Sequence, residues 1–465
     1  MTENWPTFRE LLLPAVQDAR GRRGNAVESA LRDAIRSGRL AAHTRLPSSR
    51  DLAGQLGLAR GTVKAVYEQL AAEGYLLARH GSGTRVAELG GGPALAVPEP
   101  GSPQRWRFDL RPGLPALAAF PRSEWLAVYK QALAELTDEE LGYPDPAGHP
   151  ALREELAGYL GRVRAVACPA GQILITNGAA EALSLIAGRL YVRGQRRIAV
   201  EDPSHTGQAE LLAAKGLEPI GVPVDEDGIR VDELAKTGVR AVVVTSAHQF
   251  PLGVVLHPRR RHALLDWARE HDGLVIEDDY DAEHRYDRPA LTALRSLDPE
   301  RVAYVGSVSK VLAPAPRLGW LIPPAGLRDE LVDAKRLHDL GCPSLPQAAL
   351  ARLLRTGGYD RHLRRTRKLY RARRDALVSA LAEYLPQWRA VGVAAGLHVV
   401  VRLPSGLDDR EVSRELASGG INAPALSGYA HSQPTFPGLV LGYAAIGQDR
   451  LRAAVREIAA ITRRR

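Results

Sequence analysis

The sequence contains very little cysteine, methionine or lysine, and each shortage narrows the possible functions. Cys168 and Cys342 are the only cysteines among 465 residues, and there is no C-x-x-C motif or His/Cys cluster. We therefore expect neither a disulfide scaffold nor a metal site. Met1 is the only methionine, and arginine outnumbers lysine by 55 to 7, so any lysine chemistry must use one of seven side chains.

Long apolar runs are also missing. No stretch approaches 18 consecutive apolar residues, and the first residues do not show the pattern of a signal peptide. We therefore expect a cytoplasmic protein that does not cross a membrane. Apolar residues still make up 45 % of the chain and charged residues 25 %, which excludes wholesale disorder and permits a sizeable core.

Charge and composition divide the chain into parts. The formal net charge is +9, and residues 1–86 alone hold 13 Lys and Arg against 8 Asp and Glu. Residues 87–107 contain Gly-Gly-Gly and four prolines, which is typical of a linker. We predict an N-terminal unit over 1–86, a linker over 87–107 and a larger unit over 108–465. The basic N-terminal unit fits a polyanionic partner and ordinary surface charge equally well.

The N-terminal unit shows the pattern of a winged helix-turn-helix. Apolar residues recur at helical spacing over 27–35, and a short helix is expected over 51–56 with Ser48 or Ser49 as its N-cap. A further helix begins near Arg60 and carries basic and hydroxyl residues in its first turns. Residues 75–86 alternate in polarity around a Gly-rich turn, which predicts a β-hairpin after the two helices.

The stretches RLPSSRDLAGQLGLARGTV and YEQLAAEGYLLARHGSGTRV resemble the winged-helix domain of the GntR family of transcription regulators, across nearly all of 25–86. The resemblance implies binding to double-stranded operator DNA through Arg45, Ser49, Arg50, Arg60, Thr62, Lys64, His80 and Gly81. Relatives often have Ser-Arg-Asn-Thr where this chain has Ala-Arg-Gly-Thr over 59–62, so a base-reading Asn is missing and no operator sequence is implied. A winged helix that serves only protein contacts is the alternative.

The larger unit alternates short apolar runs with amphipathic segments. The runs that read as buried strands are 172–176, 197–202, 241–246, 274–279 and 302–307. This alternation predicts an α/β fold with a mostly parallel sheet covered by helices on both faces. Functional groups in such folds gather where the strands end.

One lysine stands at such a strand end. Lys310 follows the strand at 302–307, with Ser307 and Ser309 beside it and Arg317 seven residues later. A lysine amine can condense with an aldehyde, while hydroxyl and guanidinium groups can hold a phosphate, as pyridoxal phosphate requires. Such a lysine is also common on protein surfaces, so the motif needs support from elsewhere.

Three further strand ends supply that support. Carboxylates at 277–279 could pair with a pyridinium nitrogen, and the turn at Gly178 opens a helix that could meet a phosphate. His205 follows another strand and could cover the cofactor ring. The ordinary alternatives are a solvated strand end, a simple β-α turn and a surface histidine.

The stretches YPDPAGHPALREELAGYL, HQFPLG, IEDDYDAE, VGSVSK and PRLGW resemble the fold-type I aminotransferase domain of the MocR/GabR subfamily of GntR regulators, across about 108–465. The resemblance implies pyridoxal 5′-phosphate as cofactor, with Lys310 forming the Schiff base. Asp278 would pair with the pyridine nitrogen, or Asp279 if the register is off by one, and Tyr280 would donate to the 3-hydroxyl. His205 would cover the ring. The residues implied around the phosphate are Gly178, Ala179, Ser307, Ser309 and Arg317, with Tyr143 reaching the partner subunit's phosphate in a domain-swapped homodimer.

The chain departs from that pattern at three places. Relatives usually carry Tyr where His205 stands, and enzymatic aminotransferases carry Asn where Phe250 precedes proline. No arginine lies between Arg414 and Arg450, the region from which aminotransferases clamp the substrate carboxylate. The γ-aminobutyrate-sensing relative uses an arginine where this chain has Gly207. Without that guanidinium fork, recognition of an amino-acid carboxylate would be weak.

We therefore expect a DNA-binding regulator with no catalytic residues that senses pyridoxal phosphate itself, or a small amine or amino-acid effector. The first alternative is an active aminotransferase with an accessory N-terminal domain. The second is a scaffold that no longer binds the cofactor.

Overall fold

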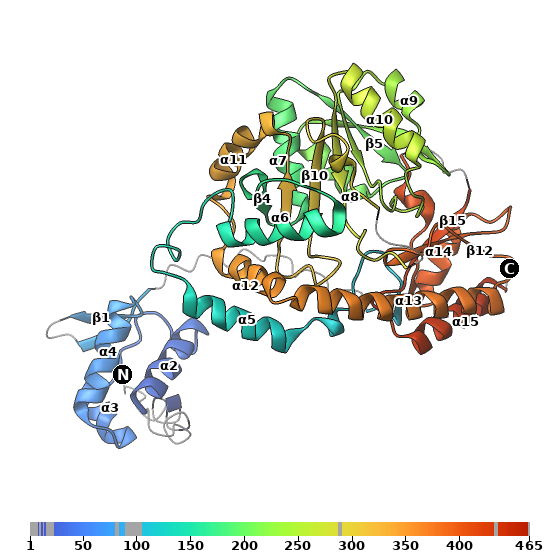
Figure 1. The fold of residues 1–465 in the computed structure, drawn as a ribbon. Coiled ribbons are helices and arrows are strands. Elements are labelled where there is room, and N and C mark those ends of the chain that lie inside the picture. Colours follow the sequence, from blue (N-terminus) through green and yellow to red (C-terminus); the bar gives the residue numbers. More distant parts are fainter. Residues whose placement is uncertain are drawn as a thin grey trace. The chain divides into compact units, whose positions relative to one another are not determined.

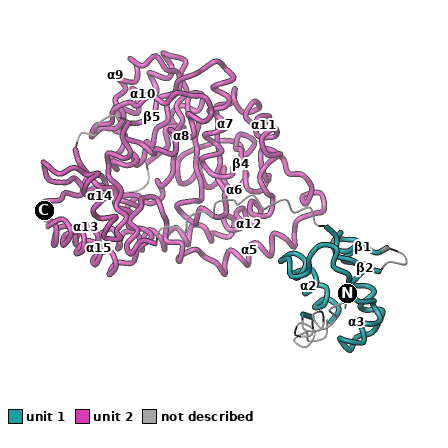
Figure 2. The backbone as a smooth tube through the Cα atoms, turned by 180° about the vertical axis from the view of Figure 1, so that it is seen from behind, with its two compact units in different colours: residues 1–103 teal, residues 104–465 magenta. Residues whose placement is uncertain are grey.

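A computed structural model describes residues 23–79, 83–88, 105–286, 291–431 and 436–463, together with Phe8, Leu11, Leu12 and Pro14. The chain forms two compact units, residues 1–103 and residues 104–465 (Figure 2). The predicted DNA contacts His80 and Gly81 lie outside the described residues. None of the helices in the described part of the chain combines the length and the hydropathy needed to cross a bilayer.

The first unit is a winged helix-turn-helix. Its described elements are α2 (Arg23–Arg36), α3 (Ser49–Leu56), α4 (Arg60–Ala72) and the antiparallel pair β1 (Leu76–Arg79) and β2 (Gly83–Val86). Of the two predicted caps, Ser48 holds the start of α3, because its side chain accepts the Asp51 N–H at 3.2 Å. Gly57, with a φ of 64°, ends that helix in the left-handed region.

The helices of this unit are held together by one apolar cluster. Val27 and Leu31 of α2, Leu52 of α3, and Val63 and Leu70 of α4 are fully buried in it. The polar faces of α3 and α4 are therefore left outside, which is the arrangement a helix-turn-helix needs to reach DNA.

The second unit is built on an eight-stranded sheet within the described residues, in the order β4-β11-β10-β9-β8-β5-β6-β7. Its strands β4, β5 and β10 are labelled in Figure 1. The bounds are β4 (Leu174–Thr176), β5 (Arg197–Asp202), β6 (Glu218–Asp225), β7 (Gly228–Ile229), β8 (Ala241–Val244), β9 (Leu274–Asp278), β10 (Val302–Ser307) and β11 (Gly319–Ile322). Strands β6, β5, β8, β9 and β10 pair in parallel, while β11 and β7 pair antiparallel with their neighbours. The predicted α/β fold with a mostly parallel sheet is confirmed.

Helices cover both faces of this sheet. Alternating side chains of β5, such as Ile198 and Ala199, enter different apolar clusters. One face packs against α7 (Ala179–Val192), α8 (Thr206–Ala214) and α11 (Ala325–Asp339). The other packs against α9 (Val231–Lys236), α10 (Pro258–Glu270), and a group formed by α5 (Arg122–Glu135), α6 (Pro150–Arg164) and α12 (Ser344–Arg355). Burial on both faces explains the nearly continuous apolar strands.

A smaller sheet follows that the sequence did not predict. Its strands β12 (Arg389–Val391), β13 (His398–Arg402) and β15 (Gly438–Gly442) pair antiparallel in that order. The sheet packs against α13 (Gly358–Tyr384), α14 (Asp409–Ser418) and α15 (Gln448–Thr462). Beside it, β3 (Phe108–Asp109) pairs in parallel with β14 (Ile421–Asn422). This pairing brings residues 111–113, from the start of the second unit, next to strands from its end.

Candidate functional site

A cavity of about 600 Å³ opens where several strands of the large sheet end. Its walls come from the turns after β4 and β5, the ends of β9 and β10, and two loops around Gly113 and Tyr429. Of the residues predicted to bind the cofactor, the cavity brings together Ala179, His205, Asp278, Tyr280, Ser307, Ser309, Lys310 and Arg317. Gly178 lies directly against Arg317.

Tyr143 does not join this group within the chain. Its side chain is 90 % exposed in the segment between α5 and α6. The prediction that it reaches a second subunit stays a prediction.

Lys310 follows β10 and directs its amine into the cavity. Its Nζ donates a hydrogen bond of 2.8 Å to the carbonyl oxygen of Gly113. Burial lowers the pKa of Lys310, although the Asp281 and Asp278 carboxylates oppose that shift. A lowered pKa increases the fraction of neutral amine, which is the nucleophilic form.

The end of β9 separates two adjacent carboxylates. Asp279 turns away from the cavity and accepts hydrogen bonds from Arg164 at 2.6 Å and Tyr304 at 2.5 Å, whereas Asp278 lines the cavity. Burial, reinforced by the charge of Asp279, raises the pKa of Asp278 to about 7. Asp278 Oδ2 accepts from Gln208, but Oδ1 is buried with no hydrogen-bond partner among the described residues. A buried acceptor of this kind suits a donor supplied by a ligand.

A histidine that sequence reasoning did not assign supports Tyr280. The Tyr280 hydroxyl lies 3.0 Å from His248 Nδ1, which lies 2.9 Å from Asp281 Oδ2. His248 and Asp281 are both buried. His248 begins the HQFPLG stretch, so the motif contained the signal, but nothing in its spacing linked it to Tyr280.

His205 lies at the mouth of the cavity, at the start of α8. Its ring packs near that of Phe250, with centroids 5.5 Å apart. Desolvation and the nearby charge of Lys310 lower the pKa of His205, so the ring is neutral near pH 7. A neutral, accessible ring is suited to lie over a planar ligand.

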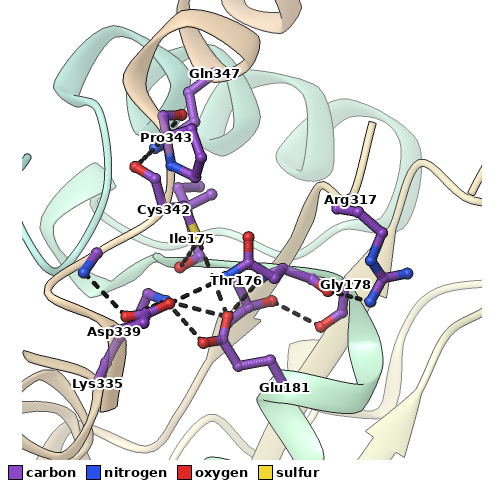
Figure 3. A network of polar contacts seen from close by, with 12 residues as sticks. Ile175, Thr176, Gly178, Glu181, Arg317, Lys335, Asp339, Cys342, Pro343 and Gln347 are labelled. Carbon is purple, nitrogen blue, oxygen red and sulfur yellow. Dashed lines mark hydrogen bonds and ion pairs between the residues drawn. The ribbon is translucent and has the colours of Figure 1, made fainter. Parts of the chain in front are cut away.

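The turn between β4 and α7 forms one end of the cavity. Gly178 has a φ of 90°, and a Cβ there would lie 3.0 Å from Arg317 Nη2. Gly178 is also the N-cap of α7, and no side chain of the described residues caps that helix. Arg317 lies beside Gly178 at the start of α7 (Figure 3). The first N–H groups of α7 and the Arg317 guanidinium can therefore bind an anion at this end of the cavity.

An arginine near the start of the second unit also lines the cavity and was not foreseen. Arg111 forms a forked pair with Asp109, with contacts of 2.7 and 3.0 Å, and Asn422 donates to the same carboxylate at 2.9 Å. Arg111 and Arg317 are the arginines among the described lining residues. The signal was weak because Arg111 follows the predicted linker and lies far in sequence from Lys310, Asp278 and Arg317.

In the first unit, the predicted DNA contacts on α3 and α4 are exposed or partly exposed. Arg50, Arg60 and Lys64 are exposed, while Val63 points into the core. Ser49 and Thr62 are partly exposed at the first turns of the two helices. Lys64 lies 3.3 Å from Glu68 in an exposed pair.

Arg45 belongs to the hairpin side of the same unit. It forms a β-bridge with Arg85 of β2, and its guanidinium lies against Gly83, where a Cβ would be 3.3 Å from Nε. These two basic residues place positive charge beside the hairpin.

Known proteins resemble both units. Residues 23–86 match the family described as bacterial regulatory proteins, gntR family, and residues 118–458 match aminotransferase class I and II. The chain is 34 % identical over 460 residues to the probable rhizopine catabolism regulatory protein MocR of Rhizobium meliloti, covering 92 % of this chain and 91 % of that protein. It is 35 % identical over 422 residues to the HTH-type pyridoxine biosynthesis transcriptional regulator PdxR of Corynebacterium glutamicum, covering 89 % and 90 %.

Among solved structures, a Pyrococcus horikoshii kynurenine aminotransferase matches with a TM-score of 0.70 and 26 % identity, over 77 % of this chain and 91 % of that one. The winged helix-turn-helix of the first unit, the aminotransferase fold of the second unit and these relatives all indicate one family. The chain belongs to the MocR/GabR-type transcriptional regulators of the GntR family, in which a helix-turn-helix domain precedes a domain of aminotransferase class I and II.

Proposed function

We propose that the second unit binds pyridoxal 5′-phosphate on Lys310 and that the state of this cofactor controls operator binding by the winged helix. The observation that carries the proposal is the buried Asp278 Oδ1, which has no hydrogen-bond partner among the described residues and belongs to the same cavity as Lys310. A protonated ring nitrogen would satisfy that oxygen and keep the carboxylate ionised.

The residues of the cavity fit the cofactor at each of its ends. Lys310 would hold the aldehyde carbon and Tyr280 the 3-hydroxyl, while His205 would cover the ring. The phosphate would lie at Arg317, Ser307, Ser309 and the first turn of α7. When bound, pyridoxal phosphate supplies an aldehyde that reacts with amines and a ring that withdraws electrons.

The sensed molecule is pyridoxal phosphate itself or a small amine or amino acid that reaches it. The printed name of the PdxR relative, a regulator of pyridoxine biosynthesis, supports the first choice. Efficient transamination is not expected, because the late arginine of aminotransferases is missing and Arg111 is already paired with Asp109.

An active aminotransferase remains the second candidate, supported by the similarity to aromatic-amino-acid aminotransferase 1 of Thermococcus litoralis, 30 % identical over 76 % of this chain. Steady-state turnover of an amino acid with a keto acid, at rates typical of enzymes, would favour this candidate over a purely sensing role.

A homodimer fits the surface of the second unit. Leu126 and Leu133 of α5 and Leu141 and Tyr143 after it are all more than half exposed. Apolar side chains gathered on neighbouring segments usually meet a partner. A second copy covering this surface would carry Tyr143 toward the other subunit's cavity.

The lysine is tested by mixing the full-length protein and a Lys310→Ala variant with pyridoxal phosphate and recording absorbance spectra. Wild type is expected to develop the visible absorbance of the covalently held cofactor, whereas the variant does not. Persistence of that absorbance in the variant would show that another residue holds the cofactor.

A further inference from the structure

A buried lysine that takes no part in the proposed function lies behind the phosphate end of the cavity. The side chain of Lys335, in α11, has no exposed surface. Its Nζ donates to both oxygens of Glu181 at 3.0 Å, and to those of Asp339 at 3.2 and 2.9 Å (Figure 3). Burial alone would lower the pKa of Lys335, but its hydrogen bonds to Asp339 and Glu181 raise it. The ammonium therefore ties the first turn of α7 to the end of α11.

The same two carboxylates hold the turn between β4 and α7. Glu181 Oε2 accepts the backbone N–H of Asn177 at 2.5 Å, and Asp339 Oδ2 accepts its side-chain amide at 3.0 Å. The carbonyl oxygen of Asn177 in turn accepts a hydrogen bond from Arg317 Nη2. A continuous path of polar contacts thus leads from Lys335 to the guanidinium at the phosphate end of the cavity.

The turn leaves little room for movement. A Cβ on Gly178 would lie 3.0 Å from Arg317 Nη2, and a Cβ on Gly319 would lie 2.7 Å from the Cα of Gly178. The backbone of the turn is therefore packed between β11 on one side and the guanidinium on the other. If the anchoring carboxylates shift, Arg317 and the first N–H groups of α7 must shift with them.

The cluster could also be interpreted as a metal site, since Glu181, Asp339 and Cys342 offer ligand atoms within 4.8 Å of one another. The Lys335 ammonium already contacts all four carboxylate oxygens. Burial raises the pKa of the Cys342 thiol to about 12, which keeps it protonated and a poor ligand. The lysine occupies the position that a cation would take.

We propose that Lys335 is a positioning residue for the phosphate end of the cofactor cavity, acting through Glu181 and Asp339 on the turn that orients Arg317. The inference rests on the proposed binding of pyridoxal phosphate. Loss of the ammonium would release the turn and leave two carboxylates unbalanced close to the phosphate, and both effects oppose an anion. The aldehyde and ring contacts of the cofactor would be unaffected.

The test compares pyridoxal phosphate with pyridoxal, which lacks the phosphate. Full-length wild type, Lys335→Met and a matched control, Lys236→Met, are titrated with each aldehyde and followed by visible absorbance. Lys236 is an exposed lysine of α9 paired with Glu233 on the surface. For Lys335→Met, we expect affinity for pyridoxal phosphate to fall about tenfold or more, by analogy with the loss seen when groups that support metal ligands are removed, with pyridoxal affinity kept within about twofold. The control should change neither affinity.

A second variant keeps the test decisive if Lys335→Met does not fold. Asn177→Ala removes the amide contact to Asp339 and leaves every charge in place, and it is expected to lower the preference for pyridoxal phosphate over pyridoxal about threefold. An unchanged preference in folded Lys335→Met or in Asn177→Ala, or equal losses for both aldehydes, would overturn the inference while the proposed function stands. Wild type that binds neither aldehyde would instead overturn the proposed function and this inference with it.

Discussion

Arg164 Nε lies 2.6 Å from Asp279 Oδ2 in an ion pair whose side chains are 1 % and 2 % exposed. Tyr304 donates to the same oxygen at 2.5 Å. This pairing fixes the end of β9, so that the preceding residue, Asp278, faces the cavity with Oδ1 unpartnered among the described residues. Asp279 therefore forms an ion pair in the core, whereas the adjacent Asp278 faces the cavity.

The first prediction is that substitution of Asp279 affects stability, whereas substitution of Asp278 affects cofactor binding. Asp279→Asn should reduce the free energy of unfolding by about 3–5 kcal/mol, because it leaves the Arg164 charge buried without its partner. Asp278→Asn should not destabilise the protein but should weaken pyridoxal phosphate binding. Denaturant unfolding and absorbance titration of both variants check this, and equal destabilisation by the two substitutions would contradict it.

The second prediction concerns pH in the absence of cofactor. The pKa of Asp278 is raised to about 7 in the folded protein, against about 3.9 in an unfolded chain. The folded state therefore holds the proton more tightly, and the contribution of this carboxyl to stability is lost as the pH rises from about 4 to 7.

The Asp278→Asn variant has no carboxyl group at this position, so it does not lose stability as the pH rises from about 4 to 7. We expect the variant to be more stable than wild type at pH 8, by up to about 4 kcal/mol, and the difference to shrink toward pH 4. Urea unfolding of both proteins at several pH values measures this difference in the free energy of unfolding. A difference that does not vary with pH would show that Asp278 does not titrate in this range.

The third prediction concerns the exposed side of α4. Lys64→Ala should weaken binding to DNA of any sequence and reduce the slope of log affinity against log salt by about 0.9, as expected for one lost phosphate contact. Its exposed pair with Glu68 contributes little to folding. Lys236→Ala, in the second unit, is the matched control. An unchanged salt slope in Lys64→Ala would place that lysine outside the DNA contact.

The fourth prediction concerns the exposed leucines of α5. Leu126 is 68 % exposed, and Leu126→Arg should convert a dimer to monomers in analytical ultracentrifugation, because it places a charge in an apolar contact. Leu337→Arg, which changes a 77 % exposed leucine of α11, tests whether the effect is specific to α5. A wild-type protein that is monomeric at micromolar concentration would contradict the expected homodimer.

Sequence patterns predicted the parts of the fold and site that depend on short stretches of chain. The apolar runs predicted β4, β5, β8, β9 and β10 of the main sheet, but not β6, β7 or β11. Lys310 stood out because Ser307, Ser309 and Arg317 lie within a few residues of it. The capping serine at α3 was foreseen as one of two adjacent candidates. In each case, the physical cause of the structure lies within about ten residues along the chain.

Contacts between distant residues could not be predicted in this way. Arg164 is 115 residues from Asp279, and Lys335 is 154 residues from Glu181. Arg164, Glu181 and Lys335 each read locally as an ordinary charge on a helix, and Asp279 reads as a polar strand end. The small antiparallel sheet was missed for a related reason, since β12 spans only residues 389–391 and β15 pairs with β13 across the long connection 403–437.

The central claim, that cofactor on Lys310 controls DNA binding, is tested most directly by one measurement. The affinity of wild type and of Lys310→Ala for DNA from the protein's own promoter region is measured with and without pyridoxal phosphate, at one fixed salt concentration. Wild-type affinity should change about 5- to 150-fold on adding the cofactor, the usual range of allosteric coupling, while Lys310→Ala should not respond. A wild type that takes up the cofactor with no change in DNA affinity, or a variant that responds as wild type does, would contradict the account.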